Sequence, residues 1–135
     1  MDHSKSHSRV RVLIVEDDDD SRDMLGELIA LLGHEALGAA NATEALRQAR
    51  EAEPLVALVD LDLPDIGGCE LARRLRACPA GPSMRLIALT GFSDEPTRKI
   101  ALEAGFDEFV VKPLMPDALE ALLSGPRDKA ESLNL

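Results

Sequence analysis

Short apolar runs alternate with amphipathic stretches along most of this chain. The runs 10–15 and 55–60 are rich in Val and Leu, and they have the length and composition of strands that are covered on both faces. The runs 85–90 and 108–111 are similar, whereas 34–39 begins with polar residues and is a weaker, more exposed candidate. The pattern therefore predicts five strands.

Apolar residues recur at helical spacing between these runs. The spacing predicts a first helix that Gly33 ends as a left-handed cap, helices over 42–53 and 69–77, a fourth with Pro96 in its first turn, and a fifth that opens at Pro116. The apolar residues of the first, third, fourth and fifth helices are Met24, Leu25, Leu28, Ile29 and Leu32; Leu71, Ala72 and Leu75; Ile100, Ala101 and Ala104; and Leu119, Leu122 and Leu123.

Some local features refine the helix assignments. Asn41, with Glu44 three residues later, has the form of an N-cap with a reciprocal partner. Residues 79–83 are predicted to form a turn. Cys69 and Cys78 are predicted on one helix, roughly 13 Å apart at a rise of about 1.5 Å per residue. A disulfide closes Cα separations of up to about 7 Å, so we expect both thiols to be free.

Five strands that alternate with five helices predict an α/β fold with a doubly wound parallel sheet, because parallel strands need crossover connections. The flavodoxin-like strand order 2-1-3-4-5 fits this count, and its switch point lies between the first and third strands. We expect one domain over residues 10–124, a flexible N-terminal tail at 1–9 and a flexible C-terminal tail at 125–135.

Composition narrows the classes of function. The 135 residues carry a formal net charge of -10 and include no Trp or Tyr, which argues against a nucleic-acid surface and against base stacking. No apolar run approaches the roughly 18 residues of a membrane span, and the first residues lack the apolar segment of a signal peptide. We therefore expect a cytoplasmic protein without a membrane or a direct nucleic-acid partner.

Polar side chains stand where four of the predicted strands end. They are Glu16 and Asp17 after the first strand, Asp60 on the third, Thr90 on the fourth and Lys112 after the fifth. Each has a structural explanation when taken singly, as a turn residue, a surface charge or a favourable charge at a helix N-terminus. Because these strand ends would share one rim of the sheet, their agreement favours a site.

The chemistry of this set points to a metal and to phosphoryl transfer. Carboxylates that lie close together repel one another, so at neutral pH they need protons or a cation. An all-oxygen set with open water positions suits Mg²⁺ better than Zn²⁺. A carboxylate such as Asp60 can also attack phosphorus and form an aspartyl phosphate. The ammonium of Lys112 would then stabilise the phosphoryl oxygens, and Thr90 could donate a hydrogen bond to one of them.

Over residues 10–123 the chain resembles the response-regulator receiver domain of two-component signalling. The motifs that carry the resemblance are Val12-Leu13-Ile14-Val15-Glu16-Asp17, Asp60 with Pro64 four residues on, Ala88-Leu89-Thr90-Gly91 and Val111-Lys112-Pro113. The resemblance implies that Asp60 is the phospho-acceptor, that Thr90 is the switch hydroxyl and that Lys112 contacts the phosphoryl group. It also implies that Mg²⁺, for which Mn²⁺ can substitute, binds Glu16, Asp17, Asp60 and the backbone carbonyl of Asp62, and that the peptide between Lys112 and Pro113 is cis.

The resemblance further implies a place in a phosphorelay. The phosphate donor would be a sensor histidine kinase or a histidine phosphotransfer protein, and the chain would catalyse only its own phosphorylation and dephosphorylation. The face for an unknown downstream protein would be built from the fourth and fifth helices and the fifth strand, and it would include Phe92, Arg98, Lys99 and Phe109. A homodimer formed on phosphorylation is a second kind of partner that the resemblance allows. Phe109 is either a switch ring or ordinary core. No DNA-binding or catalytic effector follows Leu123, which suggests a stand-alone regulator or a receiver cut from a longer protein such as a hybrid histidine kinase.

Several features leave alternatives open. Gly67-Gly68 suggests a flexible loop before the third helix, and Asp18, Asp19 and Asp20 leave the register of the metal ligands open. Asp60-Leu61-Asp62 resembles the nucleophile motif of haloacid dehalogenase-like phosphatases, but it lies on the third strand instead of the first. A flavin carrier of the same fold would need a phosphate loop after the first strand, which is missing. A receiver-like module that never takes a phosphate is the remaining alternative.

Overall fold

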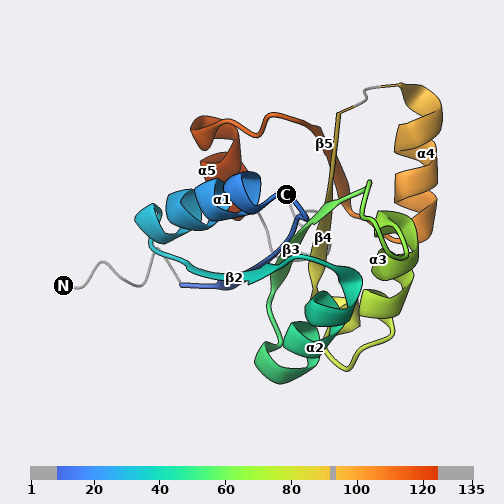
Figure 1. Ribbon diagram of the computed structural model, residues 1–135, viewed down its shortest axis with the longest axis horizontal. Helices are drawn as coiled ribbons and strands as arrows, with labels where there is room; N and C mark the ends of the chain where they lie inside the picture. The colour runs from blue at the N-terminus through green and yellow to red at the C-terminus, as the bar shows by residue number, and fades with distance from the viewer. Residues whose placement is uncertain (1–8, 92–93, 125–135) are drawn as a thin grey trace, which may run out of the picture.

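The structure, a computed structural model, describes residues 9–91 and 94–124. Except for Arg9, both tails that the sequence predicts to be flexible lie outside the described residues, as does Phe92 of the expected partner face. In the described part, the strands are β1 (Arg11–Val15), β2 (Glu35–Ala39), β3 (Val56–Asp60), β4 (Arg85–Thr90) and β5 (Glu108–Val111). The helices are α1 (Asp19–Leu31), α2 (Ala42–Ala52), α3 (Gly68–Arg76), α4 (Glu95–Ala104) and α5 (Pro116–Ser124), with a short 3-10 helix η2 (Gly81–Ser83) between α3 and β4 (Figure 1).

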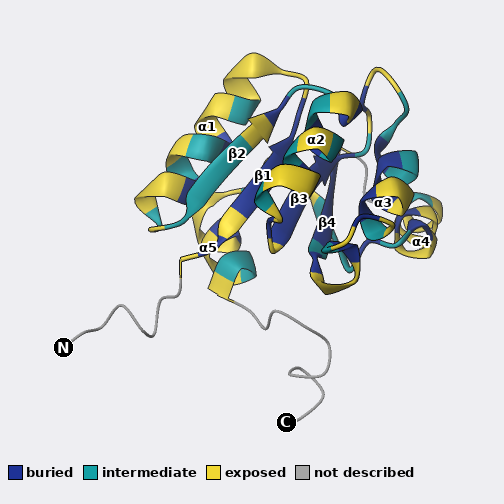
Figure 2. Cartoon of the chain, turned by 90° about the horizontal axis from the view of Figure 1, so that it is seen from below, coloured by how far each residue is buried: buried dark blue, intermediate teal, exposed yellow. Residues whose placement is uncertain are grey.

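The strands form one parallel sheet in the order β2-β1-β3-β4-β5, as the sequence predicts. Every residue of β3 is buried, which agrees with the unbroken apolar run from which this central strand was predicted (Figure 2). None of the helices in the described part of the chain has the length and the apolar composition that a membrane crossing needs.

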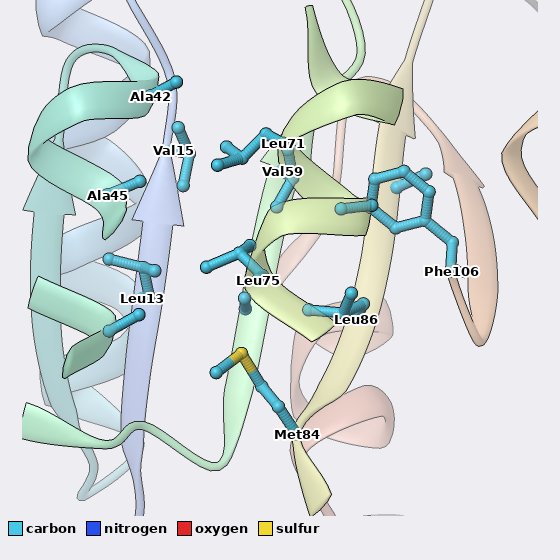
Figure 3. Packing of buried hydrophobic residues seen from close by; sticks show 14 of the residues in the cluster. Leu13, Val15, Ala42, Ala45, Val59, Leu71, Leu75, Met84, Leu86 and Phe106 are labelled. Carbon is cyan, nitrogen blue, oxygen red and sulfur yellow. The ribbon is translucent and has the colours of Figure 1, made fainter. Parts of the chain in front are cut away.

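A hydrophobic core lies on each face of the sheet. Alternate residues of β1 serve the two cores, because successive side chains of a strand point to opposite faces. Leu13 and Val15 pack with α2, α3 and α4, whereas Val12 and Ile14 pack with α1 and α5. In the first core, Leu71 and Leu75 of α3 lie over the sheet near Val59, and Ala42 and Ala45 of α2 face β1 (Figure 3).

Helix ends follow the predicted caps closely. Gly33 has a φ of 92° after the last turn of α1, so it takes the left-handed conformation that the sequence predicts. Asn41 accepts a hydrogen bond of 2.9 Å from the backbone N–H of Glu44 at the start of α2. The carboxylate of Glu44 accepts from the N–H of Ala40 at 3.1 Å, so the reciprocal bond goes one residue earlier than a regular capping box would have it.

The structure adds detail to the predicted helices and corrects two of the sequence-based expectations. Met24 and Ile100 are 62% and 55% exposed, because each precedes a core residue by one position and therefore points about 100° away from it. Residues 81–83 of the predicted turn form η2. Cys78 lies beyond the end of α3 and does not share a helix with Cys69, since Pro79 cannot continue the helix. Both thiols are free, as expected.

Gly68 has a steric role at the start of α3. A Cβ atom at this position would lie 2.7 Å from the carbonyl oxygen of Asp60 and 2.7 Å from the Cα of Leu61. The Gly68 N–H also donates to the carbonyl of Leu61 at 3.1 Å. Gly67 has a φ of 79°, which favours glycine. The glycine pair therefore lets the chain turn and pass close to the end of β3.

We expect Gly68→Ala to lower the free energy of unfolding by about 1–3 kcal/mol, the cost of overpacking against atoms that cannot move freely. Urea denaturation followed by circular dichroism measures the change. Gly26→Ala is the matched control, because a Cβ there would lie 3.8 Å from the Cβ of Ala36, an ordinary contact. Alanine inside a helix is favoured over glycine by about 1 kcal/mol, so Gly26→Ala should not destabilise the protein. Equal losses in both variants would contradict the steric role of Gly68.

Candidate functional site

The carboxyl ends of β1 and β3 bring three carboxylates together. Glu16 and Asp17 follow β1 and Asp60 ends β3, and one oxygen atom from each lies within 4.8 Å of the others. The two strands pair in parallel with Val15 opposite Val59, so the residues just after this pair share one edge of the sheet. Glu16 and Asp60 are only 3% and 4% exposed, whereas Asp17 is exposed. The cluster is thus buried on one side and open to solvent at Asp17.

Lys112 lies against the buried side of this cluster. Its Nζ donates to Oε1 of Glu16 and to Oδ2 of Asp60, both at 3.1 Å. The backbone N–H of Lys112 donates to the carbonyl of Thr90 at 2.7 Å, and the peptide bond to Pro113 is cis, as the resemblance implies. One ammonium faces two buried carboxylates and the nearby Asp17, so the cluster keeps a negative charge that attracts a cation.

The other predicted site residues lie at the same edge or next to it. Thr90 is 1% exposed and ends β4, whose Leu89 pairs with Asp60 of β3. The backbone N–H of Asp62 donates to Oδ1 of Asp60 at 2.9 Å, while the Asp62 side chain is exposed. Phe109 of β5 is half-buried and packs against the core that α2, α3 and α4 cover.

The structure resolves the register of the acidic run. The Asp18 carboxylate caps α1, where Oδ2 accepts from the N–H of Ser21 at 2.8 Å. This hydrogen bond holds the pKa of Asp18 below its usual value. Asp19 pairs with Arg22 at 2.5 Å, and Asp20 lies in the first turn of the helix. Glu16 and Asp17 are therefore the acidic pair of the cluster, and the next three residues serve the start of α1.

The environment shifts the pKa values of Glu16 and Lys112 upward for opposite reasons. Burial raises the pKa of Glu16, and repulsion by Asp60 adds to it, although hydrogen bonds from the Asp18 amide and from Lys112 oppose the rise. Burial alone would lower the pKa of Lys112, but the hydrogen bonds and charges of Asp60 and Glu16 outweigh it and raise that pKa. Lys112 is thus held charged, while Glu16 ionises less readily than usual.

In buffer without divalent cations, we expect Glu16→Gln to gain stability relative to the wild type as the pH rises above 4.5, the ordinary pKa of this carboxyl group. The folded wild type holds the Glu16 proton to a higher pH than the unfolded chain does. Its free energy of unfolding therefore falls as the pH rises through that interval, and the glutamine variant lacks this loss. Urea denaturation at a series of pH values with EDTA measures the difference. A difference that is constant or shrinks with pH would contradict the direction of the shift.

Two contacts of this region were missed from the sequence. Nη1 of Arg22 donates to the backbone carbonyl of Glu16 at 2.8 Å. Oδ2 of Asp65, in the loop after β3, accepts from the N–H of Ala42 at 2.9 Å and so caps α2 from a distant segment. The spacing of Asp19 and Arg22 predicts an ion pair on a helix, but no local pattern predicts the contact of Arg22 with Glu16 or that of Asp65 with Ala42.

The donor set fits a hard divalent cation. Glu16, Asp17 and Asp60 offer three carboxylate groups from two adjacent strand ends, and the open side at Asp17 leaves room for water ligands. Mg²⁺ prefers such a mixture of a few carboxylate oxygens with several waters.

A doubly wound parallel sheet with an acidic cluster and a lysine at the carboxyl ends of its strands defines the class of receiver-like α/β proteins. The family model of the response regulator receiver domain matches residues 12–124. The chain therefore belongs to the receiver domain family of the response regulators of two-component systems.

Relatives agree with this assignment. An uncharacterised 14.6 kDa protein of Leptolyngbya boryana is 35% identical over 109 residues, which are 81% of this chain and 83% of that protein. The transcriptional regulatory protein AfsQ1 of Streptomyces coelicolor is 34% identical over 126 residues, but the match covers 90% of this chain and only 55% of the regulator. The chain spans about half the length of several curated relatives that it matches.

Solved structures of the family are similar in fold. A CheY-like receiver domain protein of Methanospirillum hungatei superposes with a TM-score of 0.83 at 31% identity, over 93% of this chain and 99% of that chain. The receiver domain of a sensor histidine kinase from Pseudomonas aeruginosa has a TM-score of 0.78 at 27% identity, over 86% of this chain and 95% of that chain. That second structure has a magnesium ion coordinated in its active site cleft.

Proposed function

We propose that this chain is a phospho-acceptor switch of a phosphorelay. Asp60 takes a phosphoryl group from a phosphohistidine of a sensor histidine kinase or a histidine phosphotransfer protein, and hydrolysis later removes it. The observation that carries the proposal is the pair of 3.1 Å hydrogen bonds from Nζ of Lys112 to Asp60 and Glu16, beside a cluster of three carboxylates. Such a site combines a nucleophilic carboxylate with positive charge for the phosphoryl oxygens.

The residues of this edge have separate parts in the transfer. A carboxylate oxygen of Asp60 attacks phosphorus, so that an O–P bond forms while the N–P bond of the phosphohistidine breaks and the imidazole leaves with the electron pair. The N–H of Asp62 and Nζ of Lys112 hold the two oxygens of Asp60 at 2.9 and 3.1 Å, which orients the carboxylate. Mg²⁺ or Mn²⁺, held by Glu16, Asp17, Asp60 and the carbonyl of Asp62, would neutralise charge on the phosphoryl oxygens.

The same residues link phosphorylation to a surface. Thr90 ends β4, and its hydroxyl would donate to a phosphoryl oxygen on Asp60, which would move the loop that follows β4. We propose that α4, β5 and α5 form the face that a downstream protein reads, with Phe109 as a ring that follows the state of Thr90. Ile100, Val111 and Met115 are exposed apolar residues there, which supports a partner face. A shift between two states signals only to a partner that distinguishes them.

The proposal places the protein in the cytoplasm, where its only reaction is on its own aspartate. A homodimer formed on phosphorylation would use the same face. The alternative is a receiver-like module that binds its partner without phosphate. The carboxylates and Lys112 would then be needed only for folding.

Intact-protein mass spectrometry after incubation with acetyl phosphate tests the proposal. With Mg²⁺ present, we expect one phosphate-sized gain in mass, and with EDTA in place of Mg²⁺ we expect none. The absence of Trp makes mass a more direct readout than fluorescence. No gain under either condition would contradict the proposal and favour the phosphate-independent module.

A further inference from the structure

Arg22 of α1 reaches back from its helix to the end of β1. Nη1 donates to the carbonyl oxygen of Glu16 at 2.8 Å, and Nη2 donates to Oδ1 of Asp19 at 2.5 Å. The side chain as a whole is 19% exposed, so the protein covers most of its surface. A planar fork that donates in two directions fixes its own position better than a lysine ammonium would.

Gly38 of β2 provides the space for this side chain. A Cβ atom at Gly38 would lie 3.3 Å from Cδ and 3.5 Å from Cγ of Arg22. The aliphatic stem of the arginine therefore covers the glycine, and packing as well as hydrogen bonding holds it in place.

The carbonyl that Arg22 holds belongs to the peptide unit between Glu16 and Asp17. The N–H of Glu16 donates to the carbonyl of Ala39 at 3.1 Å, and the paired register of β1 and β2 ends one residue earlier, at Val15 and Ala39. Beyond that point, the sheet no longer holds the backbone. The guanidinium binds the next carbonyl along the chain, so it anchors the peptide from which both carboxylates of the pair extend.

We infer that Arg22 is a positioning residue for the acidic cluster: by holding the carbonyl of Glu16, it keeps Glu16 and Asp17 arranged for a divalent cation and increases the affinity for that cation. This inference rests on the proposed function, in which Glu16, Asp17 and Asp60 bind Mg²⁺. Groups that orient metal ligands from outside the coordination shell typically change metal affinity by about 10- to 100-fold when they are removed.

Arg22 has two effects on cation binding, and these effects have opposite signs, so an experiment can tell them apart. A guanidinium near the cluster repels a cation, so its charge alone would weaken binding, and removing it would tighten binding. Positioning has the opposite sign, because a loose Glu16–Asp17 peptide must be ordered when the cation binds. A variant without the guanidinium therefore separates the two effects by the direction of the change.

The experiment is a titration of the full chain with Mn²⁺ at neutral pH, followed by the electron paramagnetic resonance of free Mn²⁺. Arg22→Met keeps the stem over Gly38 and removes the guanidinium, and we expect it to bind Mn²⁺ roughly 10-fold more weakly than the wild type. Arg22→Lys keeps the charge but replaces the planar fork with one compact ammonium, so its affinity should fall between those of the wild type and Arg22→Met. Arg47→Met is the control, because it removes the same charge from an arginine that pairs with Glu51 on the surface of α2. It should bind as the wild type does.

Asp17→Asn separates failure of the inference from failure of the proposed site. If Asp17→Asn has lost binding but Arg22→Met binds Mn²⁺ as tightly as the wild type, or more tightly, the role inferred for Arg22 is overturned. A wild type that binds no better than Asp17→Asn overturns the metal site and the inference with it. If Arg22→Met does not fold by circular dichroism, Arg22→Lys decides: weaker binding than the wild type supports positioning, and equal binding overturns it.

Discussion

Asp60→Asn is expected to abolish the phosphate-sized mass gain with acetyl phosphate and Mg²⁺. An amide has nearly the shape of the carboxylate but lacks its negative charge, so it cannot form the acyl phosphate bond. The Asp60 side chain is 6% exposed and lies between two donors, the N–H of Asp62 and Nζ of Lys112. The single oxygen of an asparagine side chain could accept a hydrogen bond from either donor, although not from both at once. The variant should therefore fold and fail only in the chemistry.

Asp62→Asn is the matched control for this experiment. Asp62 stands two residues along the chain, its side chain is exposed, and the proposed function uses only its backbone. We expect this variant to gain one phosphate as the wild type does. Retained labelling of Asp60→Asn would show that another residue is the acceptor. Loss of labelling in Asp62→Asn would show that its side chain has a role that the structure does not suggest.

Lys112→Met is expected to slow phosphorylation by acetyl phosphate by about 100-fold, the usual cost of removing one group that stabilises developing charge. Nζ of Lys112 is 3.1 Å from Oδ2 of Asp60, so it stands where the phosphoryl oxygens would arrive. Its loss also leaves Glu16 and Asp60 without the ammonium that they share. The initial rate of the mass gain at saturating Mg²⁺ measures the effect.

Two further variants show whether charge or geometry matters at Lys112. Lys112→Arg keeps the positive charge but replaces a compact ammonium with a larger planar group, so we expect an intermediate rate. Lys99→Met removes an exposed lysine on α4 and should leave the rate unchanged. A wild-type rate for Lys112→Met would contradict the proposed part of the lysine in the transfer, even if Asp60 is the acceptor.

Most of the fold was determined by patterns that are local in the sequence. The apolar runs gave all five strands of the described chain within about a residue at each end, and the alternation with helices gave the parallel order 2-1-3-4-5. The edge at which Glu16, Asp17, Asp60 and Lys112 meet also followed from the sequence. In a parallel sheet, all strands end at the same side, so residues at strand ends converge whatever their separation along the chain.

Only the tertiary structure decided how these residues share their contacts. Five acidic residues in a row look alike in the sequence, but the start of α1 takes Asp18 as its cap, and Asp19 pairs with Arg22. Lys112 was predicted to meet a phosphoryl group, and the structure adds its bond to Glu16, 96 residues away.

The difference has a physical reason. A periodic pattern reports which side of a helix or strand is apolar, but adjacent helix residues point about 100° apart, so Met24 and Ile100 belong to the apolar repeats and are still exposed. Hydrogen bonds such as those of Arg22 to Glu16 and of Asp65 to Ala42 depend on side-chain rotamers and on gaps such as the one over Gly38. The sequence thus determined the sheet, its strand order and the edge where the site forms. The packing of side chains in the tertiary structure decided which donor pairs with which acceptor at that edge.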